Sequence, residues 1–357
     1  MAAANMTDTA STPLSILSIG AGAVGTYIGG SLALFGHRTV FLEQPAVVEV
    51  LRQQGLHLKL EDAERHIRAP LLAASMEEAL KFGPFDVALF ALKSYDTQPA
   101  VKNLLPYRET LPPILCLQNG VENEAILAEA FGDDKVIAGS LTSAIGRLTA
   151  GDVVLERKRG MGIAATHDLS HRLAAAANEA GLNARLYARP RDMKWSKMLT
   201  NLLANASSAI LNMTPAEIFS NPELCHLEIK QLREALNVMS AENIHTVDLP
   251  GTPVVALTIA VRSLPLSIAR PLVSRGIGSG RGGKMPSFHV DLYAGRGKSE
   301  VEYLNGAVVR HGQETGIPTP VNFLLNETLL ALTDGRIPLD TFAGQPEKLL
   351  AEIENNL

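Results

Sequence analysis

The feature that most constrains the fold is a glycine-rich turn near the start of the sequence. The apolar run over 14–19 predicts a short buried strand, and the sequence Gly-Ala-Gly-Ala-Val-Gly follows it directly at 20–25. A helical pattern then continues to Gly36, and a second strand is predicted over 39–42. Strand, tight turn, helix and strand form the context in which G-x-G-x-x-G binds a dinucleotide. We therefore predict a dinucleotide site at this turn.

The glycines of the motif have separate roles. The first, Gly20, permits the tight turn; Gly22 lets the backbone approach a pyrophosphate, and Gly25 allows the helix to pack closely on the strand. The N-terminus of the helix then offers free N–H groups to the phosphates. The residues predicted to contact the cofactor here are Gly20, Gly22, Ala23, Val24 and Gly25.

Length and charge limit the remaining classes. A chain of 357 residues suggests two domains of ordinary size. The formal net charge is −5 and no Lys or Arg precedes Arg38, which argues against a general nucleic-acid binder, a basic membrane-surface protein and a secretory signal. Residues 1–13 are expected to be a flexible leader.

Cysteine and histidine usage argues against disulfides and metals. The two cysteines, Cys116 and Cys225, are far apart and lack metal-ligand spacing, which fits a reducing cytoplasm. Apart from His167 and His171, the nine histidines form no H-x-x-x-H pair, and no catalytic metal is expected.

Alternating strand and helix patterns continue to about residue 190. Near-continuous apolar runs over 85–92 and 113–117 are typical of central parallel strands, a further strand is predicted over 136–145, and 152–165 predicts a hairpin or strand pair. Helical periodicity dominates from Asp192. The sequence predicts an α/β protein: a doubly wound Rossmann-type sheet over 14–190, then an all-helical domain over 191–357.

Three polar motifs lie at predicted strands of this sheet, near the strand ends where ligands are expected to bind. Lys93-Ser94 and Asn119-Gly120 follow predicted strands, and Thr142-Ser143 lies within a third. Alternative interpretations remain: Lys93 as a strand-end lysine with a solvated amine, and Asn119-Gly120 as a simple turn dipeptide.

A polar stripe is predicted at the start of the helical region. Lys197, Asn201 and Asn205 are spaced at i, i+4 and i+8, a drift of only ~40° per step on an α-helix. The positions between them are mostly apolar, and such a stripe is costly unless it meets polar partners or a ligand. The alternatives are a solvated surface stripe, and Lys194 in place of Lys197 as the functional amine.

The segment 249–284 ends in a basic, glycine-rich stretch over 274–284. It is interpreted either as a flexible connector or as a mobile lid whose cations attract an anionic substrate. Its Pro and Arg residues exclude a membrane span.

These motifs together resemble the ketopantoate reductase (2-dehydropantoate 2-reductase) family over nearly the whole chain after residue 13. The resemblance rests on residues 20–25, 92–97, 118–122, 195–205, 298–306 and 316–320. It implies an N-terminal Rossmann domain, a C-terminal helical domain, and catalysis in the cleft between them. It also implies an NADP(H) cofactor and reduction of ketopantoate to pantoate in pantothenate biosynthesis.

The resemblance implies a role for each matched residue. Lys197 matches the catalytic lysine, and Glu300 matches a carboxylate that holds the hydroxyl end of the substrate. Asn119 matches an asparagine near the nicotinamide and substrate, and Lys93 a lysine that contacts the cofactor. The remaining substrate-binding matches are Asn201, Asn205 and Ser287.

The chemistry agrees with these residue types. Hydride transfer to a 2-keto acid builds negative charge on the carbonyl oxygen, and a protonated Lys197 can stabilise that oxygen and then donate a proton. Glu300 could instead be an exposed helix charge, as is expected of Glu302, and Ser287 is the weakest assignment.

The second predicted strand departs from the family pattern. It ends in Glu43-Gln44, and the family typically has an arginine near the position of Gln44 that binds the 2′-phosphate of NADPH. A carboxylate at Glu43 favours the free ribose hydroxyl of NAD(H). Arg38, Arg52 or Lys93 could still reach a phosphate, so NADP(H) and NAD(H) both remain open.

Two other functions stay open. One is a related dehydrogenase that acts on another 2-keto or 3-hydroxy acid, and the other is a dinucleotide-binding sensor without turnover. The expected partner is a small-molecule keto acid rather than nucleic acid or a membrane, and a homodimer through the helical domain is an alternative to a monomer.

Overall fold

The structure is a computed structural model that describes residues 12–61, 63–264 and 283–355. It forms two compact units. Unit 1 comprises the described parts of Met1–Leu92, Val101–Leu117 and Leu127–Ala188, and unit 2 comprises Lys93–Ala100, Gln118–Ile126 and the described parts of Arg189–Leu357. The main division lies beside the predicted boundary at 190, but two short segments of the N-terminal half belong to unit 2.

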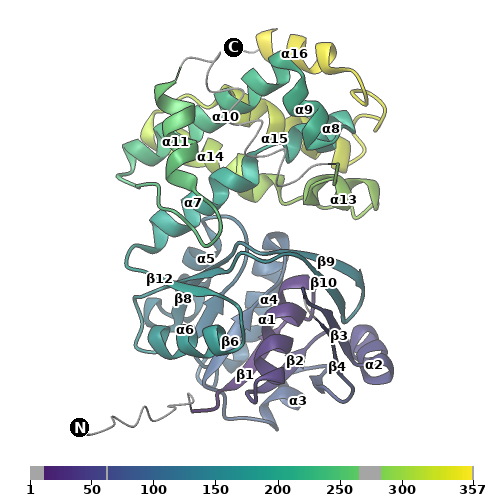
Figure 1. The fold of residues 1–357 in the computed structure, drawn as a ribbon, viewed down its shortest axis with the longest axis vertical. Coiled ribbons are helices and arrows are strands. Elements are labelled where there is room, and N and C mark those ends of the chain that lie inside the picture. The colour runs from purple at the N-terminus through teal and green to yellow at the C-terminus, as the bar shows by residue number, and fades with distance from the viewer. Residues whose placement is uncertain (1–11, 62, 265–282, 356–357) are drawn as a thin grey trace, which may run out of the picture. The chain divides into compact units, whose positions relative to one another are not determined.

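Unit 1 is built on an eight-stranded sheet of order β12-β11-β8-β7-β6-β1-β2-β5, labelled in part in Figure 1. Neighbouring strands are parallel except β8 and β11, which are antiparallel. The predicted α/β class is confirmed. The strands are β1 (Ser15–Ile19), β2 (Arg38–Leu42), β5 (Leu71–Ala73), β6 (Val87–Phe90), β7 (Ile114–Cys116), β8 (Val136–Leu141), β11 (Met161–Ala164) and β12 (Ala184–Tyr187).

The central strands are apolar because both of their faces are covered. Every residue of β6 and β7 is buried, which is why these segments read as continuous apolar runs rather than as alternating ones. The helices that begin in unit 1 are α1 (Ala23–Leu34), α2 (Pro45–Gln54), α3 (Met76–Leu80) and α6 (Ser170–Glu179). Two others, α4 (Thr97–Leu104) and α5 (Asn123–Phe131), begin in segments of unit 2.

A second sheet of unit 1 was not predicted. Its order is β4-β3-β10-β9, and its strands are β3 (Leu56–Lys59), β4 (Glu64–Ile67), β9 (Ala144–Thr149) and β10 (Asp152–Arg157). The single strand predicted over 136–145 is therefore wrong, because the chain leaves β8 at Thr142-Ser143 and enters the other sheet as β9. The hairpin predicted over 152–165 is also wrong, because β10 and β11 belong to different sheets.

Polar contacts explain this change of sheet. The Thr142 hydroxyl donates to the Gly160 carbonyl at 2.8 Å, and the Ser143 hydroxyl accepts from the amides of Arg159 and Gly160 at 3.0 and 2.9 Å. The Thr142-Ser143 motif thus closes a loop of unit 1.

Unit 2 is helical from Arg189 onward, as predicted. Within its described residues, the extended features after Arg189 are limited to an isolated bridge between Leu249 and Thr252. The helices, shown in Figure 1, are α7 (Pro190–Leu202), α8 (Ala206–Leu211), α9 (Pro215–Ser220), α10 (Pro222–Ala241), α11 (Val254–Ser263), α13 (Ser287–Tyr293), α14 (Val301–Thr315), α15 (Pro320–Thr333) and α16 (Pro346–Asn355).

Two predicted segments lie mostly outside the described residues. Only 12–13 of the predicted leader and Gly283-Lys284 of the basic glycine-rich stretch are described. In the described part of the chain, no helix combines the length and apolar character that a membrane span requires.

Candidate functional site

The glycine turn of unit 1 joins β1 to α1. Gly20 has a φ of +98°, a conformation that side chains rarely adopt. A Cβ atom on Gly25 would lie 1.9 Å from the carbonyl oxygen of Gly20, whereas one on Gly22 would meet no protein atom within 4 Å. Gly25 is therefore required by packing, and Gly22 leaves open space at the start of α1.

This turn fits the pyrophosphate of a dinucleotide. Helix α1 has Gly22 as its N-cap and no side-chain cap, so its first N–H groups lack the partner that a Ser or Asp would provide. Those N–H groups and the positive end of the helix dipole suit a phosphate placed in the space at Gly22. The predicted cofactor contacts at Ala23 and Val24 lie in this first turn.

Glu43 lies beside the same turn. It directly follows β2, and its carboxylate oxygens accept from the amides of Ala21 at 2.7 Å and Gln44 at 3.0 Å. Arg38 is at the opposite end of β2, where it donates to Ser15 and Pro84. Arg52 forms an ion pair with Glu49 at 2.6 Å. Unit 1 thus places a carboxylate, not either of these arginines, next to the glycine turn.

In unit 2, a buried carboxylate organises the segment that follows β6. Glu300, only 2% exposed, is the N-cap of α14. One of its oxygens accepts from the Lys93 amine at 2.8 Å, and the other accepts from the amide and hydroxyl of Ser94, both at 3.2 Å. The structure thus brings together Lys93 and Glu300, and the exposed alternative for Glu300 is wrong; Glu302 is exposed as expected.

Asp291 is a second anchor for Lys93 that the sequence did not reveal. Its carboxylate lies 3.1 Å from the Lys93 amine and 2.8 Å from Arg296. Burial alone would lower the pKa of Lys93, but the charges of Glu300 and Asp291 outweigh burial and raise that pKa above its ordinary value. Lys93 is therefore a cation held by two carboxylates, with 35% of its side chain exposed.

Helix α7 is tied to the segment that follows β7. Asn201 donates from its amide to the side-chain oxygen of Asn119 at 3.0 Å. Lys194 is buried, with its amine 2.7 Å from Glu124 and 2.6 Å from the carbonyl of Gln118. The amine of Lys194, the alternative functional lysine, thus binds the segment 118–126. Lys197 on the same helix is half-buried.

The predicted continuous stripe is wrong at its third member. Helix α7 ends at Leu202, and Asn205 lies beyond a turn, at the N-cap of α8. The side-chain oxygen of Asn205 accepts from the amide of Phe288 at 3.1 Å, next to the exposed Ser287 at the start of α13. Asn205 and Ser287 are therefore neighbours through α13, while Lys197 and Asn201 share α7.

Another anchor reaches the segment 118–126 from α14. Arg310 binds both carboxylate oxygens of Glu122, at 2.9 and 2.6 Å.

A group of possible metal ligands lies at the next residue of α14. His311 contacts Glu242 at 2.5 Å, and with Glu314 these two could offer three metal ligands. Glu242 is also paired with Arg191. The absence of a catalytic metal stays a prediction.

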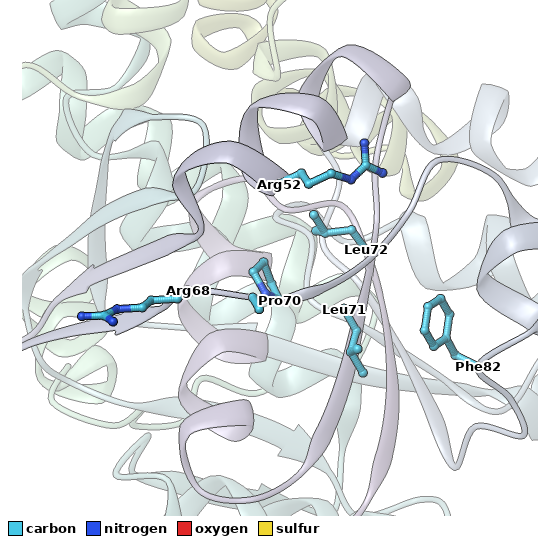
Figure 2. A pocket seen from close by; sticks show the side chains of 7 residues that line it. Arg52, Arg68, Pro70, Leu71, Leu72 and Phe82 are labelled. Carbon is cyan, nitrogen blue, oxygen red and sulfur yellow. The ribbon is translucent and has the colours of Figure 1, made fainter.

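A surface hollow of about 260 Å³ lies in unit 1, beside β5. Figure 2 shows that the guanidinium groups of Arg52 and Arg68 point away from each other, so the two cations do not converge on one ligand. Of the residues considered above as cofactor or substrate contacts, Arg52 alone lines this hollow, whose walls are Arg52, Arg68, Ala69, Pro70, Leu71, Leu72 and Phe82.

Comparisons with known proteins identify the family of the chain. A family model described as ketopantoate reductase PanE/ApbA matches residues 16–167, and the model of its C-terminal part matches 190–333. A 2-dehydropantoate 2-reductase from Halobacterium salinarum is 26% identical over 332 residues, which cover 88% of this chain and 98% of that protein.

Solved structures show the same fold. A PanE/ApbA family ketopantoate reductase from Ralstonia eutropha JMP134 matches with a TM-score of 0.76 and 27% identity, over 90% of this chain and 99% of that one. D-mandelate dehydrogenase with NADH and anilino(oxo)acetate matches with a TM-score of 0.73 and 21% identity, over 90% and 99% of the two chains.

Proposed function

The chain belongs to the ketopantoate reductase family, and from this premise we propose that it reduces ketopantoate to pantoate with Lys197 as the general acid. As a member of that family it is a nicotinamide-dinucleotide-dependent oxidoreductase that acts on a CH–OH group. The substrate, the role of Lys197 and the choice between the two nicotinamide cofactors are the proposed parts.

One observation carries the proposal. The side chains of Lys93 and Glu300, 207 positions apart, bind each other within unit 2, and in the same unit Asn119 binds Asn201. The segments that carry Lys93 and Asn119 follow two parallel strands at their carboxyl ends, where ligands of doubly wound folds bind. A fixed cation and paired amides suit the carboxylate of a small keto acid, and a buried carboxylate suits a hydroxyl group on the same molecule.

The residues divide the chemistry between them. The bound dinucleotide supplies the hydride, and the protein has to handle the charge and the proton at the carbonyl oxygen. Lys197, a half-buried residue of α7, is proposed to stabilise the developing alkoxide with its amine and then to protonate it. Because Asn119 accepts through its oxygen from Asn201, its NH₂ group is left as a donor toward the substrate or the nicotinamide.

Glu300 is proposed to accept from the hydroxyl end of the substrate. A carboxylate oxygen can accept two hydrogen bonds, and the oxygen bound to Lys93 has only that one contact in the hydrogen bonds above. The side-chain NH₂ group of Asn205 and the hydroxyl of Ser287 are proposed as further substrate contacts.

We further propose that NADH is preferred over NADPH. Glu43 places negative charge beside the glycine turn, where it would accept from a ribose hydroxyl and repel a 2′-phosphate. Of the three cations that might have balanced it, Arg38 is at the far end of β2, Arg52 pairs with Glu49, and Lys93 pairs with Glu300.

The test is turnover of ketopantoate by the purified full chain, followed as loss of reduced-nicotinamide absorbance with NADH and NADPH in parallel. We expect turnover with both and a higher kcat/KM with NADH. A higher kcat/KM with NADPH would overturn the cofactor assignment. Cofactor binding without turnover of ketopantoate would overturn the substrate assignment, and a panel of other 2-keto acids would then be assayed.

A further inference from the structure

We infer that Glu228 is a positioning residue of the keto-acid site, acting through the backbone of Ala204 to aim Asn205. This inference rests on the proposed function, because Asn205 matters to catalysis only if it binds the substrate. Glu228 lies in the middle of α10 and is 0% exposed. A fully buried carboxylate is costly unless its oxygens accept strong hydrogen bonds, so its partners indicate what it does.

Glu228 binds the backbone at the break between α7 and α8, and the residues at this break do not themselves explain why the helix ends there. Residues 202–206 read Leu-Leu-Ala-Asn-Ala, with neither Gly nor Pro, and this composition favours continuation of the helix. Yet Ala204 has a φ of +50°, in the left-handed region that a Cβ disfavours. Such a conformation persists only when surrounding contacts hold it in place.

Glu228 and Gln231 supply those contacts. One oxygen of Glu228 accepts from the Ala204 amide at 2.7 Å, and the other accepts from the hydroxyl of Ser207 at 2.5 Å. The side-chain amide of Gln231 donates to the Leu202 carbonyl at 3.2 Å and to Glu228 at 2.6 Å. At the break, the N–H group of Ala204 and the C=O group of Leu202 lack the partners that a continuous helix would give them. Glu228 accepts from the N–H group, and Gln231 donates to the C=O group.

The pair is itself held from α14 and α15. Asn305 donates from its amide to the Gln231 side chain at 3.1 Å and to Asn322 at 3.1 Å. Asn322 donates to the Gln231 carbonyl at 3.0 Å, and all three side chains are 0% exposed. Such a fully buried polar network leaves Glu228 and Gln231 little freedom to move.

The break at Ala204 determines the direction of the Asn205 side chain. If α7 continued, Asn205 would lie on the helix face of Lys197 and Asn201. Because the chain turns at Ala204, the Asn205 side chain instead accepts from the amide of Phe288, beside Ser287. Glu228 thus decides which way a substrate-binding amide points, without itself touching the substrate.

The experiment compares Glu228→Ala with Glu228→Gln in the full chain. For Glu228→Ala we expect the KM for ketopantoate to rise about tenfold, because a small misplacement of a binding group is costly, while the Kd for NADH is unchanged. Glu228→Gln should stay within about threefold of wild type, since its oxygen can accept from Ala204 and its NH₂ group can donate to Ser207. An unchanged KM in Glu228→Ala would overturn the inference.

A second substitution separates positioning from general damage. Glycine adopts the left-handed conformation without a steric cost, so adding Ala204→Gly to Glu228→Ala should recover about half or more of the lost kcat/KM. As the control, Glu234→Ala removes another carboxylate of α10, which accepts from the backbone amides of Val321 and Asn322 and from the Asn322 side chain, and so touches the network but not Ala204. It should lower the Tm with an unchanged KM; an equal rise in KM, or no recovery by Ala204→Gly, would contradict positioning.

A readout without turnover keeps the two proposals distinguishable. Hydrogen exchange at the Ala204 amide should be slow in wild type, faster in Glu228→Ala and slow again in Glu228→Gln. If ketopantoate is not turned over but this pattern appears, the proposed function fails and the backbone role of Glu228 stands. Equal exchange rates in all three would overturn that role.

Discussion

The turn after β1 and the break after α7 both bring the backbone into the positive-φ region, at Gly20 with +98° and at Ala204 with +50°. In the first, the conformation is encoded locally, because glycine has no Cβ to oppose it. In the second, an alanine is held there by Glu228 and Gln231, which come 24 and 27 positions later in the sequence.

The two turns should therefore be sensitive to substitutions at different places in the chain. The glycine turn should fail only when its own residues change, whereas the break in unit 2 should fail when a buried side chain of α10 changes. A locally encoded turn suits a phosphate site made from backbone N–H groups. A break imposed by tertiary contacts lets one helical segment carry Lys197 and Asn201, and the next carry Asn205.

The largest expected effect breaks the local turn. In Gly25→Ala the new Cβ would lie 1.9 Å from the Gly20 carbonyl oxygen, so the turn cannot keep its geometry. We expect a loss of more than ~4 kcal/mol in the free energy of unfolding, the range of severe overpacking, and no NADH binding. Urea denaturation and cofactor titration check both.

Gly22→Ala is the matched control for that change. Its Cβ meets no protein atom within 4 Å, so unfolding should be nearly unaffected. The Kd for NADH should nevertheless rise, because the methyl group would occupy the space assigned to the pyrophosphate. Equal stability losses in Gly22→Ala and Gly25→Ala would contradict the separate roles of the two glycines.

The next effect tests the two lysines of α7 against each other. Lys197→Ala should lower kcat by ~10²–10⁴-fold with little change in Tm, the usual range for loss of a general acid. Lys194→Met should instead lower the Tm, because it leaves Glu124 without its ion-pair partner, and should change kcat less than about tenfold. Steady-state kinetics with both variants decides; the reverse pattern would move the general acid to Lys194.

These contrasts show what the sequence alone could predict. The turn at 20–25, the parallel strands and the helical second half follow from glycine placement and from periods of two and 3.6 residues, which are local signals. The break at Ala204 could not be predicted, because its cause lies on another helix. Asp291 was missed for the same reason, and the second sheet because the outer strand β4 is almost wholly exposed and lacks an apolar face.

The Lys93–Glu300 pair shows an intermediate case. Family resemblance singled out both residues, but nothing in their spacing predicts that they bind each other across 207 positions. The contact depends on α14 beginning at Glu300, beside the segment that follows β6. The resemblance could single out these two residues, and their pairing could not be predicted.

A smaller effect is expected at the cofactor end of the local turn. Glu43→Gln keeps an oxygen that can accept from the Ala21 amide but removes the negative charge. The ratio of kcat/KM for NADPH to that for NADH should rise about tenfold, because repulsion of the 2′-phosphate is relieved. Glu64→Gln removes the same charge from the exposed strand β4 of unit 1 and should leave the ratio unchanged. An unchanged ratio in Glu43→Gln as well would show that this carboxylate does not select the cofactor.

The smallest effect concerns how unit 1 holds the start of β1, the strand that leads into the glycine turn. The Nδ1 atom of His37 accepts from the Leu14 amide at 3.0 Å, and its Nε2 atom is buried without a partner among the described atoms. Burial lowers the pKa of His37 below its ordinary 6.5, so the folded state favours the neutral ring.

The stability that depends on this neutral ring is present at neutral pH and is lost as the pH falls below 6.5 toward the folded-state pKa. Urea denaturation should show a lower free energy of unfolding at about pH 5.5 than at about pH 7.5. His37→Asn, whose carbonyl oxygen can accept from Leu14 without titrating, should show a shallower pH dependence. The same slope in both proteins would mean that the acid sensitivity of unit 1 arises elsewhere and that this end of β1 does not depend on the neutral imidazole.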